Sequence, residues 1–117
     1  MKKKLSCLLL ALAATCVPAA ARQCMPAGNV EPQIQGEGAR SDEYYNTVRV
    51  VFTNHNAYAV NVESEIVVPL KDGGTRKIRE MMYIPASDSK TVKKVSNSCD
   101  MDVQNAYINK FYVTQCE

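Results

Sequence analysis

The chain has 117 residues with 14 basic and 12 acidic side chains, five cysteines, one histidine and no tryptophan. This length allows one domain around one core, which excludes a multidomain architecture. A formal net charge of +2 gives no argument for general attraction to nucleic acid or to a membrane surface, and we expect no nucleic-acid partner.

The first 21 residues follow the order of a secretory signal peptide. Lys2–Lys4 form the positively charged start, Leu5–Ala14 form the apolar stretch, and Pro18 breaks any helix before Ala19–Ala21. We expect a signal helix with cleavage after Ala21, because small residues suit a signal peptidase. The apolar stretch is too short to span a bilayer, so we expect a mature chain without a transmembrane span, in the periplasm or secreted.

A lipid-anchored protein is the alternative form of export. Its anchor would be a cysteine directly after the apolar stretch, preceded by leucine and small residues. Cys16 follows Ala-Ala-Thr, and Cys24 follows Arg22 and Gln23. Neither cysteine fits the anchor pattern as well as residues 1–21 fit a cleaved signal peptide.

Cleavage after Ala21 would change both the charge and the cysteine count. It would leave 11 basic against 12 acidic residues, and the cysteines Cys24, Cys99 and Cys116. In an oxidising compartment we expect one disulfide. The pairing Cys99–Cys116 is favoured because these residues flank the last segment of the chain, whereas Cys24–Cys116, which would pin both termini together, is the rival. With the favoured pairing, Cys24 would be a free thiol or would link two copies in a dimer.

Residues 22–43 are predicted to be an irregular N-terminal segment. They contain two prolines and three glycines but few apolar side chains. A short first strand is expected over residues 30–35, and Gly36–Glu43 is predicted to be a loop.

Residues 44–117 are predicted to form the β domain. Residues 48–53 alternate with the two-residue period of a strand that has one buried face. Asn54–Asn56 is predicted to be a turn, because asparagine tolerates left-handed backbone angles. Val60–Val68 alternates most clearly, and this strand would place both Glu63 and Glu65 in water.

The rest of the chain continues the pattern of short strands and turns. Lys71–Gly74 is predicted to be a hairpin turn. It leads into a strand over Thr75–Ile84, where Glu80 falls in line with Ile78, Met82 and Ile84, so either a bulge or a partly exposed face is expected. The remaining predicted elements are a turn at Ser87–Ser89, a strand at Lys90–Ser96, a loop at Asn97–Asp102 and a last strand at Ala106–Cys116.

The stretch Val48–Asn54, then Asn56, then Val60–Ile66 is similar to the second and third strands of immunoglobulin-like or fibronectin-III-like sandwiches in exported bacterial proteins. This resemblance of architecture implies an all-β, antiparallel sandwich of five to seven strands. The tryptophan of true immunoglobulin domains is absent. Such sandwiches act as adhesion, assembly and binding modules, which is an implication of the fold alone.

No catalytic constellation is evident in the sequence. His55, the single histidine, lies in a predicted turn without a third orienting group, and three distant cysteines lack zinc-ligand spacing. Asp100 and Asp102 resemble a calcium loop only in part, because the glycine and the bidentate glutamate are missing. Glu63 and Glu65 on one strand are more typical of a solubilising surface than of a glycosidase. We therefore expect no enzymatic activity, no metal and no cofactor.

A cluster of basic residues is the feature of the sequence that most clearly suggests a binding surface. If the strands 75–84 and 90–96 paired across the Ser87 turn, their basic residues would form one face for an acidic partner. The structural alternative is edge protection, since lysines on edge strands block aggregation. The six residues are Arg76, Lys77, Arg79, Lys90, Lys93 and Lys94.

The aromatic residues divide into two predicted groups. Phe52, Phe111 and Tyr83 are predicted to lie in the core. Tyr44 and Tyr45, with Arg40, are candidate interface residues beside the glycine-containing loop.

Two functions from different classes are consistent with these observations. The first is a non-enzymatic exported module that binds another macromolecule of the cell envelope or the exterior. The second is a secreted inhibitor of a foreign enzyme such as lysozyme, which would insert the loop at residues 36–41 into an active site.

Overall fold

The computed structural model describes residues 23–116, so the predicted signal peptide lies outside the described residues. The described chain is all-β, as predicted, and its one short helix is a single 3-10 turn. No helix among residues 23–116 is long and apolar enough to cross a membrane. The elements are β1 (Cys24–Pro26), β2 (Val30–Ser41), β3 (Tyr44–Asn54), β4 (Val60–Pro69), β5 (Thr75–Ile84), β6 (Ser89–Val95), η2 (Val103–Asn105) and β7 (Tyr107–Cys116).

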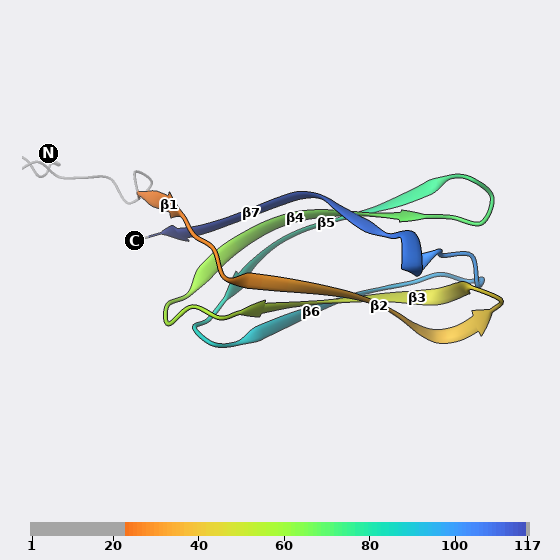
Figure 1. The fold of residues 1–117 in the computed structure, drawn as a ribbon, viewed down its shortest axis with the longest axis horizontal. Helices are drawn as coiled ribbons and strands as arrows, with labels where there is room; N and C mark the ends of the chain where they lie inside the picture. The colour runs from red at the N-terminus through yellow and green to blue at the C-terminus, as the bar shows by residue number, and fades with distance from the viewer. Residues whose placement is uncertain (1–22, 117) are drawn as a thin grey trace, which may run out of the picture.

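The strands form two antiparallel sheets that pack face to face (Figure 1). The four-stranded sheet has the order β1-β7-β4-β5, and the three-stranded sheet has the order β2-β3-β6. The chain passes between the sheets after β1, after β3 and after β5 at one end of the sandwich, and after β6 at the other end. The central strands are therefore β3 in one sheet and β7 and β4 in the other.

The core lies between the sheets and follows from the alternation in β3 and β4. Val48, Val50 and Phe52 of β3 are fully buried, and Phe52 stacks on Phe111 of β7 with ring centroids 6.2 Å apart. Each buried aliphatic or aromatic side chain of this kind stabilises the fold by about 1.5–3 kcal/mol. The buried apolar residues contributed by β4 are Val60, Val62, Ile66, Val67 and Val68, of which Val67 lies on the outer side.

The strand predicted over residues 30–35 is present, but the rest of the N-terminal segment is less irregular than predicted. Residues 24–26 form β1, and residues 30–41 form a twelve-residue strand that pairs with β3, with a register shift between Glu37 and Arg40. Proline and glycine are tolerated here because β2 is an edge strand and pairs on one side only. The β domain thus begins before residue 44, and the predicted loop at 36–43 is mostly strand.

The predicted hairpin between β4 and β5 is confirmed. Gly73 has φ of +95°, Leu70 N–H donates to Gly74 O at 2.8 Å, and the pairing along both strands has no register shift. Glu80 is half-buried and lies opposite Ser64, so of the two expectations the partly exposed face holds and the bulge does not.

The chain changes direction close to the turn predicted at Asn54–Asn56, but Asn54 is the last residue of β3 and the bend lies at residues 56–58. Its physical basis also differs from the prediction. In the described residues, positive φ among non-glycine residues occurs at Asn29, Asp42 and Ser87. Asn54 is instead fully buried, and its Nδ2 donates to the carbonyl oxygens of Tyr58 (2.9 Å), Pro85 (3.1 Å) and Ile84 (3.2 Å).

Asn56 extends this buried network to the first crossing between the sheets. Its Nδ2 donates to Asn54 Oδ1 at 2.9 Å and to Gly28 O at 2.6 Å, and its backbone N–H donates to Asn54 Oδ1 at 2.9 Å. Two asparagine side chains thus hold the connections after β1, β3 and β5 together. Satisfied buried polar networks of this kind specify one arrangement of the chain.

The disulfide joins Cys24 to Cys116, so the favoured pairing Cys99–Cys116 is wrong and the rival pairing is present. The antiparallel register of β1 and β7 places Cys24 opposite Cys116, with Cα atoms 4.1 Å apart. Cys99 precedes β7, whose ten residues span about 30 Å at the usual rise of a strand. Cys99 is the free thiol, and the predicted dimer through Cys24 is therefore not supported.

We predict that Cys24→Ser or Cys116→Ser lowers the free energy of unfolding by about 4–5 kcal/mol, because the bond closes a sequence separation of 92 residues. Urea unfolding followed by circular dichroism measures this loss. Cys99→Ser is the matched control and should leave the midpoint unchanged. Equal losses for all three variants would contradict the assignment.

We predict that Asn54→Ala lowers the free energy of unfolding by about 3 kcal/mol, because buried carbonyl groups lose their donor. Asn54→Asp, which keeps the acceptor oxygen but removes the amide donor, should lose a similar amount. Thr53→Ala, on the opposite side of the same strand, should change it by less than about 0.5 kcal/mol. If the Asn54 variants lost as little free energy of unfolding as Thr53→Ala, the buried asparagine network would not be required for stability.

Candidate interaction surface

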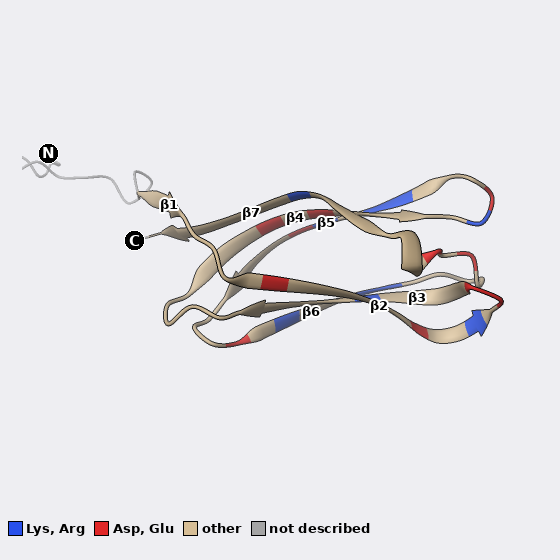
Figure 2. Ribbon diagram, viewed as in Figure 1, with Lys and Arg blue, Asp and Glu red and all other residues tan. Residues whose placement is uncertain are grey.

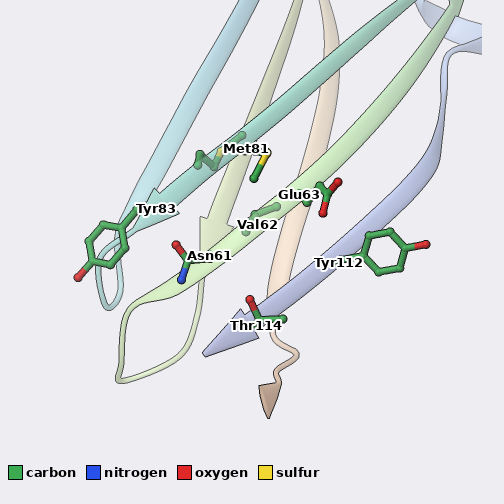
Figure 3. Close-up of a pocket in the computed structure, with 8 residues that line it drawn as sticks. Asn61, Val62, Glu63, Met81, Tyr83, Tyr112 and Thr114 are labelled. Carbon is green, nitrogen blue, oxygen red and sulfur yellow. The ribbon is translucent and has the colours of Figure 1, made fainter. Parts of the chain in front are cut away.

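The outer side of the four-stranded sheet carries a depression flanked by large exposed side chains. Met81, Tyr83 and Tyr112 are 81%, 60% and 58% exposed, and we call these three residues the Tyr–Met face. The depression has a volume of about 290 Å³. Figure 3 shows Tyr83 and Tyr112 on opposite flanks, with the side chains of β4 between them. Its lining residues are Asn61, Val62, Glu63, Met81, Met82, Tyr83, Tyr112 and Thr114.

The strand register produces this shape. Two rows cross the strands β5, β4 and β7: one is Tyr83–Asn61–Thr114 and the other is Met81–Glu63–Tyr112. Residues directly opposite each other in antiparallel strands point to the same side of the sheet. Asn61 is shorter than Tyr83 of β5, and Glu63 is shorter than Tyr112 of β7, so the middle strand β4 lies lower than the two tyrosines.

A buried carboxylate lies next to the depression, two residues beyond Glu63 on the same side of β4. Glu65 of β4 is only 4% exposed, and its two oxygens accept hydrogen bonds from Arg79 Nε of β5 at 2.7 Å and from Asn109 Nδ2 of β7 at 2.6 Å. Glu63 is exposed as predicted, but the prediction that Glu65 lies in water is wrong because these neighbours cover it. Glu65 therefore ties three strands together beside the Tyr–Met face.

The same contacts change the acidity of Glu65. The hydrogen bond from Arg79, followed by that from Asn109, lowers the pKa of this carboxyl to about 2, although burial acts in the opposite direction. The carboxylate is thus charged throughout the range in which proteins normally work.

The six basic residues do not form one hairpin face. β5 pairs with β4 and β6 pairs with β3, so the two strands belong to different sheets and the predicted pairing across the Ser87 turn is wrong. The turn carries the chain from one sheet to the other. Each of these two pairings has no register shift and is made with a strand rich in apolar residues. Figure 2 shows basic residues on both strands.

Both basic strands are edge strands, and part of their charge is already paired. Arg79 contacts Glu65, and Lys93 Nζ lies 3.0 Å from Glu37 Oε1 of β2. Lysine and arginine at sheet edges oppose edge-to-edge association. The arrangement thus favours the structural alternative for Arg76, Lys77, Arg79, Lys90, Lys93 and Lys94 over an acidic-partner face.

The predicted interface residues Arg40, Tyr44 and Tyr45 lie at the β2–β3 hairpin. The Arg40 guanidinium lies 5.2 Å from the centroid of the Tyr45 ring, and Lys71 Nζ lies 5.5 Å from that of Tyr44. Tyr45 also exchanges two backbone hydrogen bonds with Met101 at 2.9 and 3.0 Å. All three residues are engaged within the fold rather than displayed on a free loop.

The remaining candidates for chemistry stay separate. His55 Nε2 lies 3.2 Å from Glu31 Oε1 on the surface, and Asn105 Nδ2 donates to Asp102 Oδ2 at 2.8 Å in the predicted calcium-like loop. Among residues 23–116, no three histidine, cysteine or carboxylate side chains group as metal ligands would.

The sequence reasoning missed the Tyr–Met face. Tyr83 was predicted to be a core residue, but it is exposed and Ile84 beside it is buried. The alternation of β5 indicates the exposure of Tyr83. Ile78, Met82 and Ile84 share the inner side, so the odd-numbered residues of this strand must point outward. No periodicity in the sequence could have indicated that Tyr112 of β7 would join the same surface.

Comparison of the chain with protein-family models, with curated proteins and with solved structures found no match in any of the three.

We predict that Glu65→Gln weakens the dependence of stability on acid. A carboxyl with a lowered pKa contributes stability that is present above its unfolded pKa of about 4.3 and is lost as the pH falls through about 2. The urea midpoint of the native protein should fall between these pH values, and that of Glu65→Gln should fall less. Glu63→Gln is the matched control on the same strand, and an unchanged pH profile in Glu65→Gln would contradict the prediction.

Proposed function

We propose that this chain is an exported, non-enzymatic module that binds another macromolecule of the cell envelope or the exterior through the Tyr–Met face. The observation that carries the proposal is the exposure of Met81, Tyr83 and Tyr112 around one depression. Tyrosine and methionine are enriched where proteins meet, because their large, adaptable side chains gain contact area on association. Contiguous exposed apolar groups of this kind mark interaction sites.

Export is part of the proposal. The signal-peptide pattern in residues 1–21 supports it, with cleavage after Ala21 and a periplasmic or secreted mature chain. The Cys24–Cys116 disulfide supports it independently, because such bonds persist in oxidising compartments.

We infer in addition that the sandwich is immunoglobulin-like. In that fold the strands A, B and E share one sheet, and C, F and G share the other. The order β2-β3-β6 fits A, B and E, and β4 with β7 fits C and F, which places β1 beside F. This correspondence supports a fold that commonly serves recognition, without identifying the partner.

An inhibitor is the second candidate function, and it would have to present the β2–β3 hairpin in place of a free loop. Residues 36–41 belong to β2, and Gly36, Glu37, Arg40 and Ser41 pair with β3. The exposed Tyr–Met face supports the binding module more directly.

Site-specific photocrosslinking tests the proposal. Met81 is replaced by a benzophenone amino acid in the full-length protein, expressed in the cell that makes it, and Thr91 on the outer side of β6 is the matched control position. We expect a defined crosslinked species at position 81 but not at 91, which disappears in a Tyr83→Ala/Tyr112→Ala background. No crosslink, or equal crosslinking at both positions, would overturn the proposal.

The salt dependence of the same crosslink separates two kinds of contact. An apolar contact through Met81, Tyr83 and Tyr112 should persist at high salt, because screening weakens mainly exposed charge pairs. Loss of the crosslink at high salt would instead assign the contact to the basic strands β5 and β6, and therefore to an acidic partner.

A further inference from the structure

One sheet edge is only partly covered. β1 pairs with Cys116, Gln115 and Thr114 of β7, and Ala27 N–H donates to Val113 O at 2.9 Å. The chain then leaves β7 and enters β2 at Val30. Among residues 23–116, no strand pairs with this side of β7 from Tyr107 to Tyr112.

The backbone direction of β7 makes this stretch available for pairing. Val113 directs its carbonyl towards β1, and in an antiparallel ladder the residues that address one side recur at every second position. The N–H and C=O groups of Phe111 therefore point to the uncovered edge. These groups lie two residues before Val113, whose carbonyl already accepts the hydrogen bond from Ala27 beside β1.

The side chains beside this edge leave an apolar seam between the two sheets. Ile108 and Phe111 of β7 and Ile34 of β2 pack against the core but are only half-buried. A mostly polar surface pocket of about 460 Å³ lies before the start of β7 and is lined by Ile34, Gly36, Arg40, Glu43, Tyr45, Val103, Gln104 and Ala106. The apolar part of the seam is therefore the half-buried surface of Ile34, Ile108 and Phe111.

The other three sheet edges are protected against such pairing. β5 and β6 carry the six basic residues described above, and Lys90 and Lys94 of β6 share the inner side with Val92. β2 contains Pro32 and a register shift after Glu37. Inward charges, proline and bulges are the devices that block edges. Apart from one bulge and Lys110, the stretch of β7 from Tyr107 to Tyr112 lacks them.

We propose that the β7 edge from Tyr107 to Tyr112 accepts an extended segment of a partner polypeptide as an added strand. The segment continues the line of β1, pairs with the backbone of Phe111, and directs alternate small or apolar side chains to the seam at Ile34 and Phe111. Main-chain hydrogen bonds supply affinity and the seam supplies selectivity in this mode of recognition. The proposal rests on the proposed function and names the form in which the partner is recognised.

A partner polypeptide fits this edge better than a second copy of the chain. Symmetric antiparallel pairing of residues 107–112 with themselves would centre between Asn109 and Lys110. The register shift against β4 lies at the same place, where Lys110 faces Glu65 and Ile108 faces Ile66. Two bulges would then oppose each other, whereas a strand from a partner would meet only the single bulge of β7.

The test uses the disulfide-bonded chain of residues 22–117 and a synthetic peptide with the sequence of residues 60–68. This sequence is chosen because β4 already pairs with β7 in antiparallel fashion on the other side. Amide hydrogen exchange read by NMR should slow about tenfold or more at Phe111 when the peptide binds. The control peptide has proline in place of Val62, Ser64 and Ile66, and it should protect no amide.

A second variant keeps the test decisive if the free peptide binds weakly. It carries the same nine residues after Glu117 through a flexible linker, which raises the local concentration of the segment to about the millimolar range. Phe111 should be protected in this variant but not in its proline-substituted counterpart.

Three outcomes would overturn the inference. One is no protection of Phe111 in either format, and another is equal protection at the edges of β5 or β6. The third is protection without peptide that grows with protein concentration, which would make a second copy the occupant. Because the Met81 crosslink does not depend on Phe111, the binding function could stand while this inference fails.

Discussion

The buried amide of Asn54 is the interaction on which the arrangement of the two sheets depends. The chain passes between the sheets three times at that end of the sandwich, after β1, β3 and β5. Each passage exposes backbone carbonyls that no strand can pair. Asn54 and Asn56 satisfy carbonyls from all three passages with two side chains. The sheets are thus fixed by polar contacts at one end and by apolar packing along their length.

Local patterns predicted the elements well but did not predict their partners. The strands near 48–53 and 60–68 and the turn at Lys71–Gly74 follow from alternation and from glycine chemistry, which act over a few residues. β2 was predicted only over residues 30–35, and its continuation to Ser41 was missed because an edge strand tolerates proline and glycine. The partners of β5 and β6, the buried state of Glu65 and the Cys24–Cys116 pairing depend on contacts between distant segments, which no local pattern encodes. The change of direction after Asn54 was predicted from left-handed backbone angles, but it depends on the buried hydrogen bonds of the Asn54 side chain.

The two proposed contacts meet on β7. One uses a side chain on the outer side of this strand, and the other uses backbone groups at its edge. Tyr112 directs its side chain to the Tyr–Met face, whereas Phe111 directs its backbone to the uncovered edge and its ring to Phe52 in the core. Glu65 and Asn109 hold β7 against β4 on the outer side of the sheet, beside the Tyr–Met face. A partner that adds a strand would therefore lie within reach of the Tyr–Met face, on a support that three strands keep rigid.

The disulfide has a mechanical consequence. Cys24 and Cys116 are adjacent across β1 and β7, so the bond joins the points at which the chain enters and leaves the sandwich. A pulling force applied through the residues before Cys24 and after Cys116 would pass along this covalent bond and would not load the hydrogen bonds of either sheet. Under such a force the sandwich stays folded for as long as the bond is oxidised.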